Sequence, residues 1–245
     1  MHLGLITSDE SALARGADRL RAAGATGVES AVLRRSGDPA SDRLELDRVL
    51  NAVQGHRIAL DLPLGDLVAL LHRMMRRGEI ETTETAVLGP RPVSLIGLGL
   101  PAQPEAAARL AVHGQVRTVG LLKDDSGGVL IDAARLSAWP ASDHPASAAS
   151  ASAARRTPFW LRAYVDDTPV CDGSATSLLI ERVGTSLLRA TATRPGLRRT
   201  RVVQGRALQL ACDDALIVSD GVAREQPRGK RTWWCEPTYW RVALP

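Results

Sequence analysis

The stretch HLGLITSDESALARGADRLRAAGATGVESAVL, residues 2–33, decides the fold. An apolar run at residues 3–7 predicts a buried strand, and residues 28–33 predict a second one. Between them, Thr7 and Glu10 have the spacing of a capping box, so a helix is expected to follow as far as Ala23 and to end at Gly24. A strand, a helix and a strand in this order predict a parallel pair joined by a helical crossover.

The same alternation continues along the first half of the chain. Helical patterns occupy residues 41–53, 66–77 and 104–112, and strand-like apolar runs occupy residues 57–62, 85–88, 93–98 and 116–122. Strands separated by helices predict an α/β domain whose parallel sheet is covered by helices on both faces.

The second half of the chain has a different composition. No aromatic residue occurs before Trp139, which is the first of eight. Residues 141–157 are rich in Ala and Ser and have no hydrophobic period, which is typical of a linker or loop. We therefore predict an α/β domain at residues 1–140, a linker at 141–157 and a β-rich domain at 158–245.

Short β-type runs between turn residues predict that this second domain is an antiparallel β-sandwich. Asp213-Asp214 is expected to form a tight hairpin between two such runs, and Asp220-Gly221 is a second hairpin signal. Trp233 and Trp234 are interpreted as part of a strand that locks onto the first domain. The runs lie at residues 160–165, 175–180, 186–193, 200–203, 207–212, 215–219 and 240–244.

The overall composition is that of a globular protein, with 44% hydrophobic and 24% charged residues. No apolar stretch approaches the ~18 residues of a membrane span, and no signal peptide is recognisable. The three cysteines, Cys171, Cys212 and Cys235, form no zinc pattern, so we expect them to be buried and reduced. These features predict a cytoplasmic protein with no metal site.

The positive charge is concentrated near the end of the chain. Residues 194–245 contain ten basic and five acidic residues, whereas the whole chain has a net charge of +4. Such a region could meet the phosphates of a nucleotide, or of lipids at a membrane surface to which the protein would bind peripherally. A solvated strand face in an arginine-rich protein explains the same pattern, and no nucleic-acid partner is expected.

A ligand of a parallel sheet binds at the carboxyl ends of the strands, and three loops qualify. The loop at residues 7–10 has no glycine and carries carboxylates, so it is a poor phosphate cradle. In the loop at residues 61–66, Gly65 could approach a ligand, while Asp66 is also expected to cap the following helix. The loop at residues 88–92 offers Arg91 to an anion. No recognised nucleophile or phosphate-loop motif is present.

The second half of the sequence resembles the diacylglycerol kinase catalytic family. Residues 205–221 are similar to the family's strand, turn and strand that lead to Asp-Gly-Glu, residues 161–185 resemble the start of its β-domain, and residues 105–122 resemble the segment before it. The resemblance implies the diacylglycerol kinase and NAD kinase-like fold, with a nucleotide cleft between two domains. It also implies ATP and magnesium as cofactors, a lipid hydroxyl as phosphate acceptor and a homodimer as one possible assembly.

The sequence departs from the motifs of this family. The nucleotide loop Gly-Gly-Asp-Gly-Thr is replaced at residues 62–66 by Leu-Pro-Leu-Gly-Asp, and the next motif is replaced at residues 89–94 by Gly-Pro-Arg-Pro-Val-Ser. The position of the family's catalytic glutamate is Val222, which cannot accept a proton, and the nearest carboxylate is Glu225. Loss of a general base alone typically lowers the rate ~10²–10⁴-fold.

Three hypotheses follow. The first is a diverged, catalytically impaired relative of lipid kinases with a binding or regulatory role, which need not bind a cofactor. The second is an active ATP-dependent lipid kinase that uses Asp220 and Glu225 as catalytic groups. The third is a non-kinase α/β module that holds another anion through Arg91, Arg117 and the C-terminal arginines. The candidate nucleotide-binding residues are Gly65, Asp66, Arg91 and Gly221.

Overall fold

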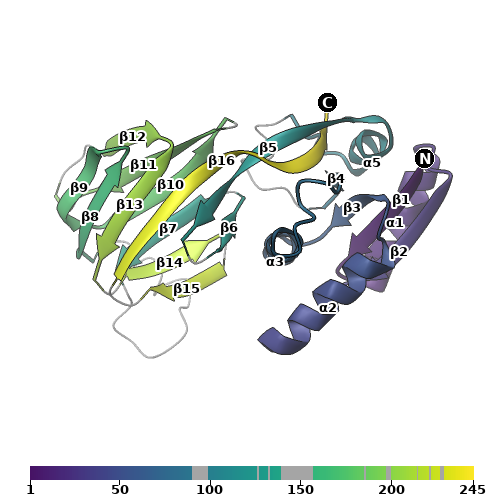
Figure 1. Ribbon diagram of the computed structural model, residues 1–245, viewed down its shortest axis with the longest axis horizontal. Helices are drawn as coiled ribbons and strands as arrows, with labels where there is room; N and C mark the ends of the chain where they lie inside the picture. The colour runs from purple at the N-terminus through teal and green to yellow at the C-terminus, as the bar shows by residue number, and fades with distance from the viewer. Residues whose placement is uncertain are drawn as a thin grey trace. The chain divides into compact units, whose positions relative to one another are not determined.

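The computed structural model divides the chain into two compact units (Figure 1). Unit 1 comprises Met1–Val119 and Thr238–Pro245, and unit 2 comprises Gly120–Pro237. The structure describes residues 1–89, 99–125, 127–131, 133–138, 157–184, 186–196, 200–213, 215–220, 222–226 and 229–245, with only the backbone described at 222–226, 237 and 238. Most of the predicted linker lies outside the described residues, so a boundary at 141–157 remains a prediction.

Unit 1 is an α/β domain, as predicted. Its strands run in the order β2-β1-β3-β4, every neighbouring pair is parallel, and the end of β16 (Gly229–Leu244) joins β4 through Val242. The other elements are β1 (His2–Thr7), α1 (Glu10–Ala22), β2 (Gly27–Val32), α2 (Pro39–Ala52), β3 (Arg57–Asp61), α3 (Leu64–Arg76), β4 (Thr85–Val87) and α5 (Pro104–His113).

The two faces of this sheet are covered by different helices. Leu3 and Leu5 of β1 pack with Leu20 of α1 and Ala111 of α5 in one apolar cluster. On the other face, a Cβ atom at Gly4 would lie 2.6 Å from Cβ of Val53, the residue that ends α2. Strand alternation explains this arrangement, because neighbouring residues of β1 point to opposite faces.

The capping box predicted at the first helix is wrong. Asp9 is the N-cap of α1, and its carboxylate accepts a hydrogen bond of 2.7 Å from the Ala12 N–H. The hydroxyl of Thr7 donates to the backbone carbonyl of Asp9 instead. The carboxylate of Asp9, two residues closer to the helix, therefore takes the role that the spacing alone assigned to Thr7.

Unit 2 consists of two antiparallel sheets around one apolar core, which confirms the predicted β-rich architecture. One sheet has the order β16-β13-β8-β9, and the other has the order β12-β11-β10-β7-β14-β15. The elements are β5 (Gln115–Asp124), which begins in unit 1, β6 (Val129–Leu130), β7 (Ala133–Ala138), β8 (Phe159–Val165), β9 (Thr168–Ala175), β10 (Ser177–Val183), β11 (Leu187–Thr193), β12 (Arg201–Gly205), β13 (Ala207–Cys212), β14 (Ala215–Ser219) and β15 (Val222–Gln226).

One of the two predicted hairpins is correct and the other is wrong. β14 and β15 are antiparallel and pair with Ser219 opposite Val222, as the hairpin predicted after β14 requires. The strands on either side of Asp213-Asp214 do not pair with each other, because β13 pairs with β8 and β16 whereas β14 pairs with β7 and β15. The chain therefore passes from one sheet to the other between Cys212 and Ala215.

The aromatic strand β16 contributes to both units. Trp233 is buried in the core of unit 2, so its predicted docking on the first domain is wrong. Trp240 docks there instead: it is fully buried, and its indole N–H donates a hydrogen bond of 2.8 Å to the hydroxyl of Thr85. The reason is that β16 continues past unit 2 and completes the sheet of unit 1 at β4.

The three cysteines are buried, as expected, and they form no disulfide bond. Burial raises the pKa of the Cys235 thiol, which keeps it protonated and unreactive. Among the helices that the structure describes, none is long and apolar enough to cross a membrane.

Candidate functional site

The loops that follow β1, β2 and β3 lie at one edge of the unit 1 sheet, because these strands are parallel (Figure 1). The strands end at Thr7, Val32 and Asp61, and each is followed by a helix. In open parallel sheets ligands bind at this carboxyl edge, so a ligand site of unit 1 is expected there.

Gly65 and Asp66 lie in the first turn of α3. The N-cap is Pro63 rather than Asp66, and no side chain caps the helix. The backbone N–H groups of Asp66 and Leu67 both donate to the carbonyl of Pro63, at 3.0 and 2.9 Å. The predicted capping role of Asp66 is therefore wrong, because the helix begins two residues before it.

The carboxylate of Asp66 is held by a cation from the neighbouring loop. Arg35 lies 3.3 Å from Asp66 and 3.1 Å from Asp42, so it bridges the first turns of α3 and α2. Asp42 is only 5% exposed and also accepts hydrogen bonds from the N–H groups of Ser36 and Gly37. Burial acts to raise the pKa of Asp42, but these hydrogen bonds outweigh it, and the pKa lies below its ordinary value.

This network determines the electrostatics of the α3 terminus. A helix N-terminus normally attracts anions through its free N–H groups and its dipole. Here the negative charge at that position belongs to Asp66, and it is paired with Arg35. A phosphate bound here would lie beside the carboxylate of Asp66 and beside Arg35, which already forms ion pairs with Asp66 and Asp42.

The loops after β3 and β4 are in close contact. Leu62 is 1% exposed, and a Cβ atom at Gly89 would lie 2.9 Å from the backbone nitrogen of Leu62. The N–H of Leu88 donates to the carbonyl of Leu60 at 2.8 Å. The two segments thus pack directly on each other, and a glycine is required at position 89.

A hollow of about 440 Å³ is lined by residues of α1, of the end of β2 and of α2. Its charged side chains are already paired: Arg34 lies 2.7 Å from Glu10, and Arg48 lies 2.7 Å from Glu45. The hydrogen bond from Arg48 is the largest cause of a lowered pKa at Glu45. For an anion to bind in this hollow, Arg34 and Arg48 would each have to break an existing ion pair with a glutamate.

Asp220 belongs to unit 2 and is buried. It is 3% exposed, and its two carboxylate oxygens accept hydrogen bonds from the N–H groups of Ile131 and Ala133, at 2.8 and 3.2 Å. Its φ angle is +47°, a left-handed conformation that Asp adopts more readily than most residues. These bonds fix the start of β7 against the β14–β15 hairpin.

The structure describes the remaining candidates only in part. Arg91 and Gly221 lie outside the described residues, and of Glu225 only the backbone in β15, opposite Leu216, is described. Gly65 and Asp66 are adjacent in unit 1, whereas Asp220 is in unit 2. No sequence motif marks Arg35 or Asp42, and only the acidic first turn of α2 indicates Asp42.

Comparison with solved structures identifies the fold. No protein-family profile and no curated protein matches the sequence. A diacylglycerol kinase from Bacillus anthracis str. Sterne superposes with a TM-score of 0.70 at 10% identity, covering 100% of this chain and 96% of that one. An NAD kinase from Archaeoglobus fulgidus in complex with ATP gives a TM-score of 0.60 at 11% identity, covering 99% and 93%. The chain has the fold of diacylglycerol kinases and NAD kinase, as expected.

Proposed function

We propose that this chain is a kinase-like protein without phosphotransferase activity, which acts by binding a ligand or a partner. The shared fold supports an origin among nucleotide-dependent kinases. At 10–11% sequence identity to these structures, the residues of the site can differ completely although the fold is shared.

The observation that carries the proposal is the Asp66–Arg35–Asp42 network. It occupies the terminus of α3, where the resemblance places the glycine loop that approaches phosphates in active kinases. Phosphoryl transfer depends on positioned phosphates, a metal ion and a group that orients the nucleophile. Pro63 and Leu64 in that loop, together with Val222 at the position of the base, supply none of these groups.

The candidate catalytic groups support the same conclusion. The carboxylate oxygens of Asp220 hold two backbone N–H groups, so proton transfer by Asp220 would leave buried donors without partners. We infer that Asp220 is kept for the fold of unit 2. An active site that uses Asp66, Asp220 and Glu225 is the second candidate, because a neighbour of the same fold was crystallised with ATP.

The test is a phosphate-transfer assay with radiolabelled ATP, magnesium and diacylglycerol in mixed micelles, run beside an active bacterial diacylglycerol kinase. Calorimetry with ATP, with and without magnesium, accompanies it. We expect no transfer and no ATP binding up to millimolar concentration. Magnesium-dependent transfer that is abolished in Asp220→Asn, with the fold of the variant intact, would establish the second candidate instead.

A matched pair of variants tests the electrostatic argument. If Asp66 repels phosphate, Asp66→Asn strengthens any binding of ATP, whereas Asp18→Asn, at an exposed site on α1, leaves it unchanged. An equal change of ATP affinity in the two variants would show that Asp66 does not repel phosphate at this position.

The basic C-terminal region is our candidate for a partner surface. Arg201 and Arg206 are exposed in unit 2. Arg231 and Arg241 are paired with Asp125 and Glu84. An acidic partner or an anionic lipid surface would meet the exposed arginines, and sedimentation with anionic vesicles at low and high salt tests this.

A further inference from the structure

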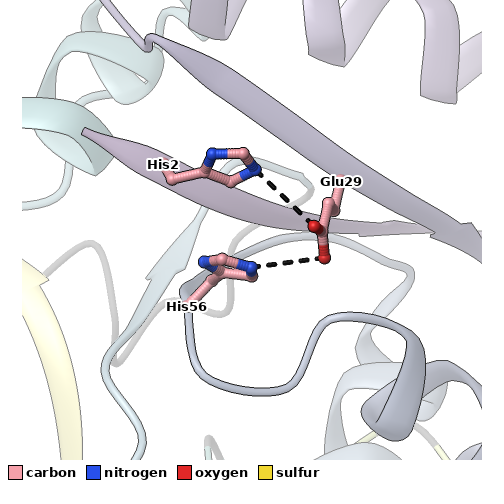
Figure 2. Close-up of side chains that lie close together, drawn as sticks. All are labelled: His2, Glu29 and His56. Atoms are coloured by element: carbon pink, nitrogen blue, oxygen red, sulfur yellow. Dashed lines mark ion pairs between the residues drawn. The ribbon is translucent and has the colours of Figure 1, made fainter.

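Two histidines and a glutamate gather at the amino ends of three parallel strands in unit 1 (Figure 2). His2 opens β1, Glu29 lies in β2, and His56 immediately precedes β3. This edge of the sheet is opposite the carboxyl edge that holds Asp66. The cluster is therefore separate from the candidate site described above.

The strand register brings these side chains onto one face. Leu3 pairs with Arg57, so His2 and His56 precede adjacent paired positions, and Gly4 pairs with Glu29. Residues that are paired in a parallel sheet point to the same side, and residues two apart along a strand do so as well. His56, His2 and Glu29 consequently project from the face that Gly4 also occupies.

A glycine makes room for the contact. Gly27 is paired with His2, and a Cβ atom at Gly27 would meet the imidazole at its Cε1, Nδ1 and Nε2 atoms. The ring of His2 therefore lies across Gly27 on its way to Glu29. Gly55, with a φ angle of +87°, turns the chain just before His56.

The three donor groups converge on one point. Nε2 of His56 lies 3.2 Å from Oε2 of Glu29, and Nε2 of His2 lies 3.7 Å from Oε1. The two imidazole rings are stacked, with centroids 4.6 Å apart and planes at 23°. One donor atom from each residue lies within 4.8 Å of the other two. Among the ion pairs of the described residues, Glu29 has only these two histidines as partners.

This donor set suits a particular class of ion. Two neutral imidazoles and one carboxylate are typical ligands of Zn²⁺ and of Co²⁺ or Ni²⁺, with bonds of ~2.0–2.2 Å. Tetrahedral bonds of that length place donors roughly 3.4 Å apart, so the three side chains need to close by about an ångström. The side chains of His2 and Glu29 are 49% and 50% exposed, so they are free to make this movement and an ion can reach them.

We propose that His2, Glu29 and His56 form a binding site for one divalent transition-metal ion of the zinc class, with at least one position left open to water. The bound ion joins the amino ends of β1, β2 and the loop before β3.

The experiment uses the full chain with its own amino terminus and no histidine tag, after treatment with a chelator. Zinc is titrated by calorimetry, and Co²⁺ is titrated by visible absorption. We expect one ion per chain at micromolar affinity, with a cobalt spectrum typical of nitrogen and oxygen ligands. Affinity falls at least tenfold in His56→Ala and in Glu29→Gln.

The matched control is His72→Ala, which removes a histidine on α3 and leaves metal affinity unchanged. Glu29→Gln keeps the shape of the side chain, so it separates loss of a ligand from loss of fold, and circular dichroism checks both variants. The proposal is overturned if no ion binds at 100 µM metal or if His72→Ala weakens binding as much as His56→Ala. Thiolate charge-transfer bands in the cobalt spectrum would also overturn it, since they would assign the ion to the cysteines.

Discussion

At the scale of single residues, buried carboxylates and hydroxyls in this protein hold backbone and indole N–H groups. Asp220 accepts from Ile131 and Ala133, and Thr85 accepts from Trp240 while donating to the carbonyl of Arg241. A buried donor left without an acceptor costs about 1–3 kcal/mol, which is a large fraction of a typical net stability.

Asp220→Ala is expected to lower the free energy of unfolding by about 2–4 kcal/mol, because it leaves two donors without acceptors and places alanine at a positive φ angle. Asp220→Asn tolerates that angle and keeps one acceptor oxygen, so its loss is smaller. Urea unfolding measures both. An unchanged midpoint in Asp220→Ala would contradict the structural role.

Thr85→Val keeps the volume of the side chain but removes the hydroxyl that Trp240 requires. We expect a loss of about 1–3 kcal/mol and a changed tryptophan emission. Thr85→Ser retains the hydroxyl and serves as the control, with a smaller loss confined to one methyl group. If Ser and Val destabilise equally, the hydrogen bond is not what makes Thr85 important.

At the scale of elements, α2 and α3 are joined by charged side chains. Arg73 donates to both carboxylate oxygens of Asp47 at 2.6 Å, and Arg77 lies 3.3 Å from the same carboxylate. These arginines, with Arg73 the larger cause, lower the pKa of Asp47. A group whose pKa is lower in the folded state contributes stability above its unfolded pKa of ~3.9, and this contribution is lost as the pH falls through the folded value.

Asp47→Asn is therefore expected to cost about 1 kcal/mol at pH 7, and this difference from the natural protein should shrink below pH ~4. Urea unfolding at pH 7, 5, 4 and 3 measures it. Asp18→Asn is the matched control, since the carboxylate of Asp18 is 77% exposed beside Arg21. A difference that stays constant down to pH 3 would argue against the pKa argument.

The sequence predicts most elements of unit 1 because long periodic helices and apolar strands carry a strong signal. Helix α5 begins at the predicted residue and ends one residue later than predicted. Strand β9 was missed since Pro169 and Gly173 within it are typical turn residues. The sheet switch at Asp213 was missed as well, because a turn dipeptide does not indicate which strand its neighbour pairs with.

The contacts of the candidate site were less predictable for a related reason. Arg35 and Asp66 are 31 residues apart in sequence, and only the packing of two loops brings them together. His2 and His56 meet through strand register, which no local pattern encodes. Residue types and their places on strands could be predicted, whereas the pairs that they form could not.

At the scale of the whole molecule, unit 2 is inserted in the sequence between the two segments that form unit 1. Unit 1 is built from the first 119 residues and from Thr238–Pro245, with all of unit 2 between them in sequence. Trp240, Val242 and Ala243 in that last segment are fully buried. The end of β16 is therefore part of the core of unit 1 rather than an appendage.

Deletion of residues 238–245 is expected to destabilise unit 1 selectively. Hydrogen exchange should accelerate in β4, which loses its pairing with β16, and in β3, which pairs with β4. Strands β10 and β11 keep their protection because unit 2 retains residues 229–237. Mass spectrometry of exchanged peptides measures this. Deletion of the exposed Pro245 alone is the control, and a uniform loss of protection in both units would contradict the expectation.

The return of the chain to unit 1 also affects how the protein is made. The hydroxyl of Thr85 and the indole of Trp240, which form a hydrogen bond, are 155 residues apart. At ~5–20 residues per second, a ribosome needs roughly 10–30 s to reach Trp240 after it has released β4. Throughout that interval β4 is an open edge strand, ready to pair with the wrong chain. We therefore expect newly made copies of this protein to be most prone to aggregation before their last strand is synthesised.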